Sequence, residues 1–118
     1  MPFNPQTIAQ INVEELAERL KNDQTESLQL IDVREPSELA IAKLEGFKNL
    51  PLSQFDEWSK NIQTQLEPHR ETLVLCHHGV RSAQMCQWLI QKGFTDVKNI
   101  TGGIDSYSLR VDATIERY

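Results

Sequence analysis

The residues of this chain best suited to chemistry are a cysteine and the short segment that follows it. The segment extends from Cys76 to Ser82 and reads CHHGVRS. A cysteine acts as a nucleophile in its thiolate form, which is stabilised where backbone amides and a cation face the sulfur. Gly79 allows the backbone to turn inward without a side chain in the way, and Arg81 adds a permanent positive charge. Since the Ser82 hydroxyl can cap a helix or bind an anion, the pattern predicts a nucleophilic cysteine in a tight anion-binding loop.

A buried strand and a helix have to position this cysteine. Residues 72–75 form a short apolar run typical of a parallel strand covered on both faces, and Cys76 follows directly. From Ser82 onward the spacing is helical, and Gly93 is the expected stop. The first turn of such a helix presents backbone N–H groups that have no partner within the helix, which favours an anion there. A buried structural role is the alternative for a free cysteine, and we predict that role for Cys86 on the apolar face of the helix.

The rest of the chain alternates predicted strands with predicted helices. Strands are predicted over residues 8–11, 28–33, 47–50, 72–75 and 97–100. Helices are predicted after Asn12, over residues 36–40, from Ser53 to the residue before Pro68, from Ser82, and after the glycine pair 102–103. Residues 22–27 form a predicted polar turn. Alternation of this kind indicates an α/β fold with a parallel sheet and helices on both faces.

Length, charge and cysteine content exclude several classes of protein. The chain has 118 residues, which suits one domain, and 39% hydrophobic with 25% charged residues is typical of a soluble globular protein. The formal net charge is −5 and the basic residues form no stripe, so we expect no nucleic-acid partner. We expect no membrane partner, because no apolar run approaches the length of a membrane span and the first residues lack the features of a signal peptide. Two cysteines outside any disulfide pattern favour a reducing compartment, and the cytoplasm is our prediction.

Three stretches of the chain, taken together, resemble the signatures of the rhodanese family of sulfurtransferases. The first covers residues 31–52, the second is the CHHGVRS segment, and the third is TGGIDSY over residues 101–107. Residues that match the first signature are Asp32, Val33, Arg34, Glu35, Gly46, Asn49 and Pro51. The closing VDATIERY also resembles the tail of some single-domain members. The resemblance implies one rhodanese-like domain over residues 1–118, with a three-layer α/β/α architecture around a central five-stranded parallel sheet.

The same resemblance implies a thiosulfate sulfurtransferase that works without a metal or an organic cofactor. Cys76 would be the catalytic residue and would carry sulfur as a persulfide. The donor would be a small sulfur-containing anion such as thiosulfate, and the acceptor would be cyanide, a thiol or a protein thiol; a protein could also serve as the donor. The implied substrate-binding residues are His77, His78, Gly79, Val80, Arg81 and Ser82. Asp32 and Arg34 would brace the loop without reacting.

Two other functions fit parts of the pattern. Dual-specificity phosphatases of the cell cycle share this fold and use a loop cysteine and arginine, but their loop is one residue longer than the four residues found here between Cys76 and Arg81. We expect no phosphatase activity, because the shorter loop suits a single sulfur atom better than a phosphoryl group. The second alternative is a non-enzymatic or relay module whose acceptor is another protein. A metal site is disfavoured, because His77 and His78 are expected to diverge on a tight loop that has no further ligand nearby.

Overall fold

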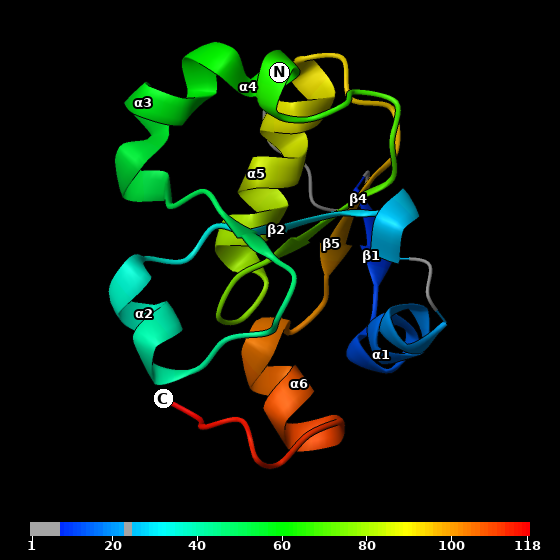
Figure 1. Ribbon diagram of the computed structural model, residues 1–118, viewed down its shortest axis with the longest axis vertical. Helices are drawn as coiled ribbons and strands as arrows, with labels where there is room; N and C mark the ends of the chain where they lie inside the picture. Colours follow the sequence, from blue (N-terminus) through cyan, green and yellow to red (C-terminus); the bar gives the residue numbers. More distant parts are fainter. Residues whose placement is uncertain (1–7, 23–24) are drawn as a thin grey trace.

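The protein forms a single five-stranded parallel sheet with helices on both faces, as predicted (Figure 1). The computed structural model describes residues 8–22 and 25–118. The strand order is β1-β5-β4-β2-β3. The strands are β1 (Ala9–Ile11), β2 (Gln29–Asp32), β3 (Lys48–Asn49), β4 (Thr72–Leu75) and β5 (Val97–Ile100). The predicted strands lie where expected, although β1, β2 and β3 are shorter than the runs that predicted them.

Helical segments connect these strands. The α-helices are α1 (Val13–Lys21), α2 (Pro36–Ile41), α3 (Phe55–Trp58), α4 (Ile62–Gln65), α5 (Val80–Gln91) and α6 (Gly103–Arg110). Short 3-10 turns are η2 (Thr25–Ser27), η3 (Leu52–Gln54) and η4 (Ser59–Asn61). Residues 1–7 and 23–24 lie outside the described part of the chain, and part of the polar turn predicted over residues 22–27 lies there with them. Across the described residues, every helix is too short or too polar to span a membrane.

Strand β4 is the middle of the sheet and carries the cysteine at its end. All of its residues are buried, which explains the uninterrupted apolar run in the sequence. It pairs with β2 on one side and β5 on the other. Because parallel strands end at the same edge of a sheet, Cys76 after β4 lies at the same edge as Asp32 at the end of β2 and Ile100 at the end of β5.

Two apolar clusters cover the faces of the sheet. One contains buried residues of α3, α4 and α5, among them Trp58, Ile62 and Leu89. The other contains buried residues of α1 and α6, such as Leu16 and Ile104. Figure 1 shows the corresponding layers, with α3, α4 and α5 on one side of the strands and α1 and α6 on the other. The sheet is therefore covered by helices on both faces, and Cys76 lies at the edge where its strands end.

Helix α1 begins with the capping box that the sequence predicted. The Asn12 side chain accepts a hydrogen bond from the Glu15 amide at 2.8 Å, and the Glu15 carboxylate accepts one from the Asn12 amide at 3.2 Å. These two contacts satisfy two amides that the helix itself leaves unpaired. They fix the point at which the chain leaves β1.

The prediction of a single helix from Ser53 to the residue before Pro68 is wrong, because the chain forms a series of short helical segments from η3 to α4. Side chains here bond to nearby carbonyl groups and compete with a regular helix. Thr64 Oγ1 donates to the Asn61 carbonyl at 2.8 Å, and Gln65 Nε2 donates to the Trp58 carbonyl at 3.1 Å. The apolar residues at helical spacing in this segment nevertheless face the core: Trp58, Ile62 and Leu66 are buried, and Phe55 is partly buried. Periodicity therefore identified the buried face but overestimated the regularity of the backbone.

Candidate active site

Cys76 lies at the end of the central strand, buried but in contact with hydrogen-bonding groups. Its exposed fraction is 1%. The Gly79 amide donates to Cys76 Sγ at 3.0 Å, and Ser82 Oγ lies 3.2 Å from the same sulfur. A negative charge on this sulfur is therefore stabilised by the Gly79 amide.

The turn after the cysteine depends on a glycine. Gly79 has a φ of 98°, in the left-handed region, and serves as the N-cap of α5. A Cβ atom at this position would lie 3.1 Å from the Gly102 amide nitrogen, so the space is tight as well. Helix α5 starts at Val80, earlier than the predicted start at Ser82. Ser82 consequently does not cap the helix; it lies in the first turn with its hydroxyl toward Cys76.

The carbonyl groups of the loop are held by the start of α6. The Ile104 amide donates to the Cys76 carbonyl at 2.9 Å, and the Asp105 amide donates to the His77 carbonyl at 3.1 Å. A Cβ atom on Gly103 would overlap with both carbonyl groups. The amides at the first turn of α6 therefore fix the backbone of the loop, and Gly103 allows the approach.

Sequence analysis missed Asn99 and Gln10, which orient the Ser82 hydroxyl beside the sulfur. Ser82 Oγ donates to Asn99 Oδ1 at 2.5 Å, and Asn99 Nδ2 donates to the Gly79 carbonyl and to Gln10 Oε1, each at 3.1 Å. Asn99 is buried in β5, and Gln10 belongs to β1. This hydrogen-bonded chain orients the Ser82 hydroxyl next to Cys76. The available signal was an amide side chain, Asn99, next to the last residue of a predicted strand.

Arg81, predicted to bind an anionic donor, is paired with a carboxylate of α2. Its Nη1 donates to Glu38 Oε1 at 2.7 Å, and its Nη2 donates to Glu38 Oε2 at 2.9 Å. The hydrogen bonds from Arg81 lower the pKa of the Glu38 carboxyl to about 2. The pKa of Arg81 is correspondingly raised by its bonds to Glu38. Glu38 is a further residue of the site that sequence analysis did not identify.

Asp32 and Arg34 form a buried ion pair at the end of β2. Arg34 Nη2 donates to Asp32 Oδ2 at 2.7 Å, and Arg34 Nε donates to Asp32 Oδ1 at 3.0 Å. Arg34 Nη1 donates to the Tyr118 hydroxyl at 3.0 Å, and this hydroxyl donates to Glu38 Oε2 at 2.7 Å. The pair therefore connects to Arg81 through Tyr118 and Glu38. In Figure 1 the C-terminal tail (red) returns to α2, where these contacts form.

The two histidines after Cys76 stack with each other and do not diverge as expected. Their ring centroids are 3.9 Å apart with an interplanar angle of 34°. The His77 ring also stacks on the Tyr118 ring, with the centroids 3.9 Å apart and an interplanar angle of 5°. Burial, followed by the nearby His78, lowers the pKa of His77 below its ordinary value, so this imidazole is neutral at neutral pH. His78 Nδ1 lies 3.8 Å from Asp105 Oδ2.

The second cysteine has a different environment. Cys86 is fully buried on the apolar face of α5, as predicted, and packs among the residues of the cluster that covers this face of the sheet. Burial raises the pKa of the Cys86 thiol to about 12. This residue is therefore a neutral part of the core.

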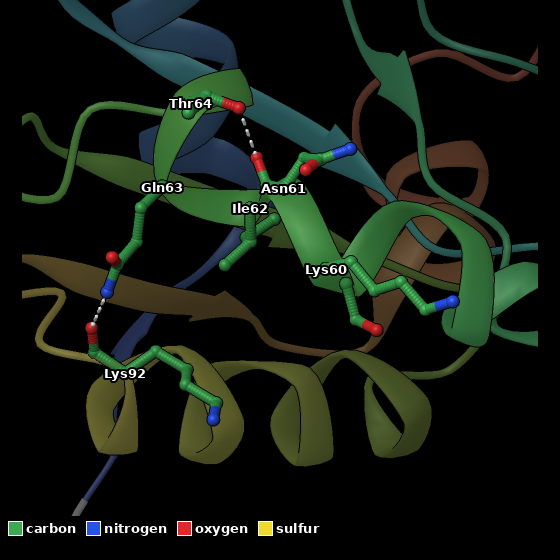
Figure 2. A pocket seen from close by; sticks show the side chains of 7 residues that line it. Lys60, Asn61, Ile62, Gln63, Thr64 and Lys92 are labelled. Carbon is green, nitrogen blue, oxygen red and sulfur yellow. Dashed lines mark hydrogen bonds between the residues drawn. The ribbon is translucent and has the colours of Figure 1, made fainter.

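A separate shallow pocket of about 300 Å³ lies at the other end of α5 (Figure 2). Its lining includes Lys60, Asn61, Ile62, Gln63, Thr64 and Lys92. Gln63 Nε2 donates to the Lys92 carbonyl at 2.8 Å across this pocket. Since α5 separates Lys92 from the loop at its first turn, the pocket is not part of the cysteine site.

Comparison with known proteins agrees with this geometry. Residues 12–110 match the family model of the rhodanese-like domain. The chain is 48% identical over 112 residues to the rhodanese-like/PpiC domain-containing protein 12, chloroplastic, of Arabidopsis thaliana, covering 94% of this chain and 38% of that protein. It is 30% identical over 101 residues to a sulfurtransferase of Allochromatium vinosum, covering 86% of this chain and 89% of that protein.

Solved structures show the same fold. The crystal structure of a rhodanese-related protein from Thermoplasma volcanium superposes with a TM-score of 0.71 at 33% identity, covering 87% of this chain and 93% of that one. The chain spans 38% and 64% of the lengths of the first two curated relatives, from Arabidopsis thaliana and Bacillus subtilis. The chain has a cysteine with a hydrogen-bond donor at the end of the central strand and a pair of glycines at the start of α6. Together with these matches, they lead to one conclusion: the chain belongs to the rhodanese-like domain family.

Proposed function

We propose that the protein is a sulfurtransferase in which Cys76 carries sulfane sulfur as a persulfide. The observation that carries this proposal is the Gly79 amide, which donates to Cys76 Sγ at 3.0 Å at the end of the central strand. A persulfide is anionic, and donors fixed in a site that excludes water stabilise such a charge. Membership of a family with sulfurtransferase relatives supports the proposal.

The proposed reaction has two steps and needs no external oxidant. In the first step, the Cys76 thiolate attacks the outer sulfur of thiosulfate, a new sulfur–sulfur bond forms, and sulfite leaves with the electron pair of the broken bond. In the second step, cyanide or a thiolate attacks the outer sulfur of the persulfide. Thiocyanate or a new persulfide is released, and Cys76 returns to its thiolate form.

The residues around the cysteine have supporting roles in this proposal. The loop from His77 to Ser82 would surround the outer sulfur. Because Cys76 is only 1% exposed, the loop has to shift to admit a donor. Asp32 and Arg34 are fully engaged with each other and Tyr118, so we assign them to bracing the site.

A transfer to a protein thiol is a second form of the same activity. Val80, in the loop, is 67% exposed and offers apolar surface beside the cysteine. A partner protein that approaches here could deliver or accept the sulfur directly. We propose a reducing compartment such as the cytoplasm, because both cysteines in the described part of the chain are free thiols.

The test is to offer the protein sulfur donors and to measure the sulfur bound to it by intact mass spectrometry. The protein is incubated with thiosulfate, with a small persulfide and with a cysteine desulfurase, and its intact mass is measured. We expect one added sulfur atom, removable by cyanide as thiocyanate, and no addition to Cys76→Ala. Cys86→Ala is the matched control and should still take up sulfur. Absence of added sulfur with all three donors would exclude persulfide transfer and leave the binding-module alternative.

A further inference from the structure

The cationic side chain of the loop is already neutralised within the protein. Arg81 makes two hydrogen bonds to the Glu38 carboxylate, at 2.7 and 2.9 Å, which is the bidentate geometry of a strong ion pair. Glu38 is held in turn by the Tyr118 hydroxyl at 2.7 Å and by its position in α2. A donor that binds Arg81 would therefore compete with a carboxylate that is fixed in place.

The other charges around the loop are paired as well. Arg34 is bound to Asp32, and Arg117 Nε donates to Asp105 Oδ1 at 2.9 Å. The guanidinium groups of Arg34, Arg81 and Arg117 thus each have a carboxylate partner. Since His77 is neutral at neutral pH, this set of residues has little net positive charge to attract a doubly charged anion.

We propose that Glu38 is a specificity-determining residue, which makes the site favour singly charged persulfide donors over the doubly charged thiosulfate. This inference rests on the proposed function, since it concerns the donor for Cys76. The carboxylate cancels the charge of Arg81, so the ion pair offers no net attraction to an approaching dianion. A singly charged persulfide has less of this attraction to lose and depends more on the hydrogen bond at the sulfur.

Both donors lead to the same modified enzyme. The Cys76 thiolate attacks the outer sulfur of thiosulfate and releases sulfite, or it attacks the outer sulfur of a small persulfide and releases the thiolate of that molecule. One sulfur–sulfur bond forms and one breaks in each case. The difference between the donors is therefore the charge that has to approach Arg81 and Glu38.

The experiment measures how fast Cys76 is loaded by each of two donors. Intact mass is followed in a single turnover with thiosulfate and, separately, with mercaptoethanol persulfide, for the wild-type protein and for Glu38→Gln. Glutamine keeps the size of the side chain and one acceptor oxygen but removes the charge. We expect the ratio of the thiosulfate rate to the persulfide rate to rise about five-fold or more in Glu38→Gln, from Coulomb interaction with a dianion near the surface.

Two control variants separate local charge from other effects. Glu67→Gln makes the same change in net charge at an exposed pair with Arg70, on the approach to the amino end of β4 and away from the loop. It should change the donor ratio by less than about two-fold, because distant surface charges are screened. Glu38→Asp keeps the charge and should keep the donor ratio near that of the wild type.

Each possible outcome tests either the role of Glu38 or the proposed function. An unchanged ratio in a Glu38→Gln protein that still loads would overturn the role of Glu38 while leaving the persulfide mechanism intact. No loading of the wild type by either donor would overturn the proposed function itself. If Glu38→Gln fails to fold, the salt dependence of the wild type decides. A thiosulfate rate that changes less than about two-fold with ionic strength supports a neutralised Arg81, and a steep fall contradicts it.

Discussion

Cys76 and Cys86 are both almost completely buried, at 1% and 0% exposed, yet their surroundings are opposite in character. Cys76 receives a hydrogen bond from the Gly79 amide and lies 3.2 Å from the Ser82 hydroxyl. Cys86 is enclosed by apolar side chains, and its pKa is raised to about 12. The comparison shows that burial alone does not determine the chemistry of a thiol. What matters is whether polar groups replace the water that burial removes.

The position of each cysteine relative to α5 explains this difference. Cys76 precedes the helix, where the first amides have no partner within the helix and one of them, at Gly79, faces the sulfur. Cys86 lies in the interior of the helix, where the backbone amides are used by the helix itself. A thiol placed before a helix therefore finds donors that a thiol inside the helix does not.

The largest effect that we expect is on alkylation by iodoacetamide. In the native protein at mildly alkaline pH, Cys76 should react at least about a thousand-fold faster than Cys86, since a thiol with a strongly raised pKa forms almost no thiolate. Peptide mass spectrometry after timed quenching measures both rates, and Cys76→Ala should react slowly throughout. Equal alkylation rates at the two positions would contradict the interpretation that their surroundings make the two thiols differ in reactivity.

Cys86→Ser should reduce stability without affecting sulfur transfer. The new hydroxyl would be buried among apolar side chains, so we expect the free energy of unfolding to fall by about 2 kcal/mol. Urea unfolding measures this change, and the loading rate of Cys76 serves as the second measurement. A loss of loading in a folded Cys86→Ser protein would show that the two sites are coupled, contrary to our interpretation.

Ser82→Ala should slow the loading of Cys76 with sulfur by about ten-fold, because it removes the hydroxyl that connects the buried Asn99 to the loop beside the sulfur. The change also leaves Asn99 Oδ1 without the hydroxyl that it binds. Ser108→Ala is the matched control, because it removes another buried helical hydroxyl, one that donates to the Ile115 carbonyl at 2.6 Å. Single-turnover loading distinguishes them; equal slowing by both variants would indicate a general loss of structure.

The smallest effect is a decrease in stability at alkaline pH that originates at Cys86. Its pKa is raised from 9.0 to about 12, so above pH 9 the unfolded chain loses this proton while the folded chain keeps it. The contribution is complete below pH 9 and is lost as the pH rises toward 12. From pH 9 to 10 we expect a loss of about 1 kcal/mol that is missing in Cys86→Ala. Urea unfolding of both proteins across this range tests the sign, and parallel pH profiles would contradict it.

The sequence predicted the elements that depend on local patterns. The buried run before Cys76, the capping box of Asn12 and Glu15 and the glycine before α6 all lie where they were expected. Each of these features can be predicted because it depends on residues that are close to one another in the sequence. The helix predicted from Ser53 failed for a related reason: apolar spacing shows which face is buried, whereas side-chain bonds to carbonyl groups decide whether the backbone stays regular.

The polar surroundings of the loop were less predictable, because they come from distant segments. Asn99 reaches the site from β5, Glu38 from α2 and Tyr118 from the C-terminal tail. Neither spacing nor composition indicates that these side chains meet. The resemblance located the cysteine and Arg81, but the pairing of Arg81 with Glu38 requires the three-dimensional arrangement. A prediction about donor charge made from the loop sequence alone therefore omits the carboxylate that neutralises Arg81.

The attachment of the loop to α6 has a mechanical consequence. The backbone carbonyls of Cys76 and His77 are bonded to the first amides of α6, and Gly103 leaves no gap between them. A displacement of α6 would therefore be passed on to the backbone of Cys76 and His77. A protein that binds the outer side of α6 and displaces this helix would therefore alter the reactivity of Cys76 without contacting it.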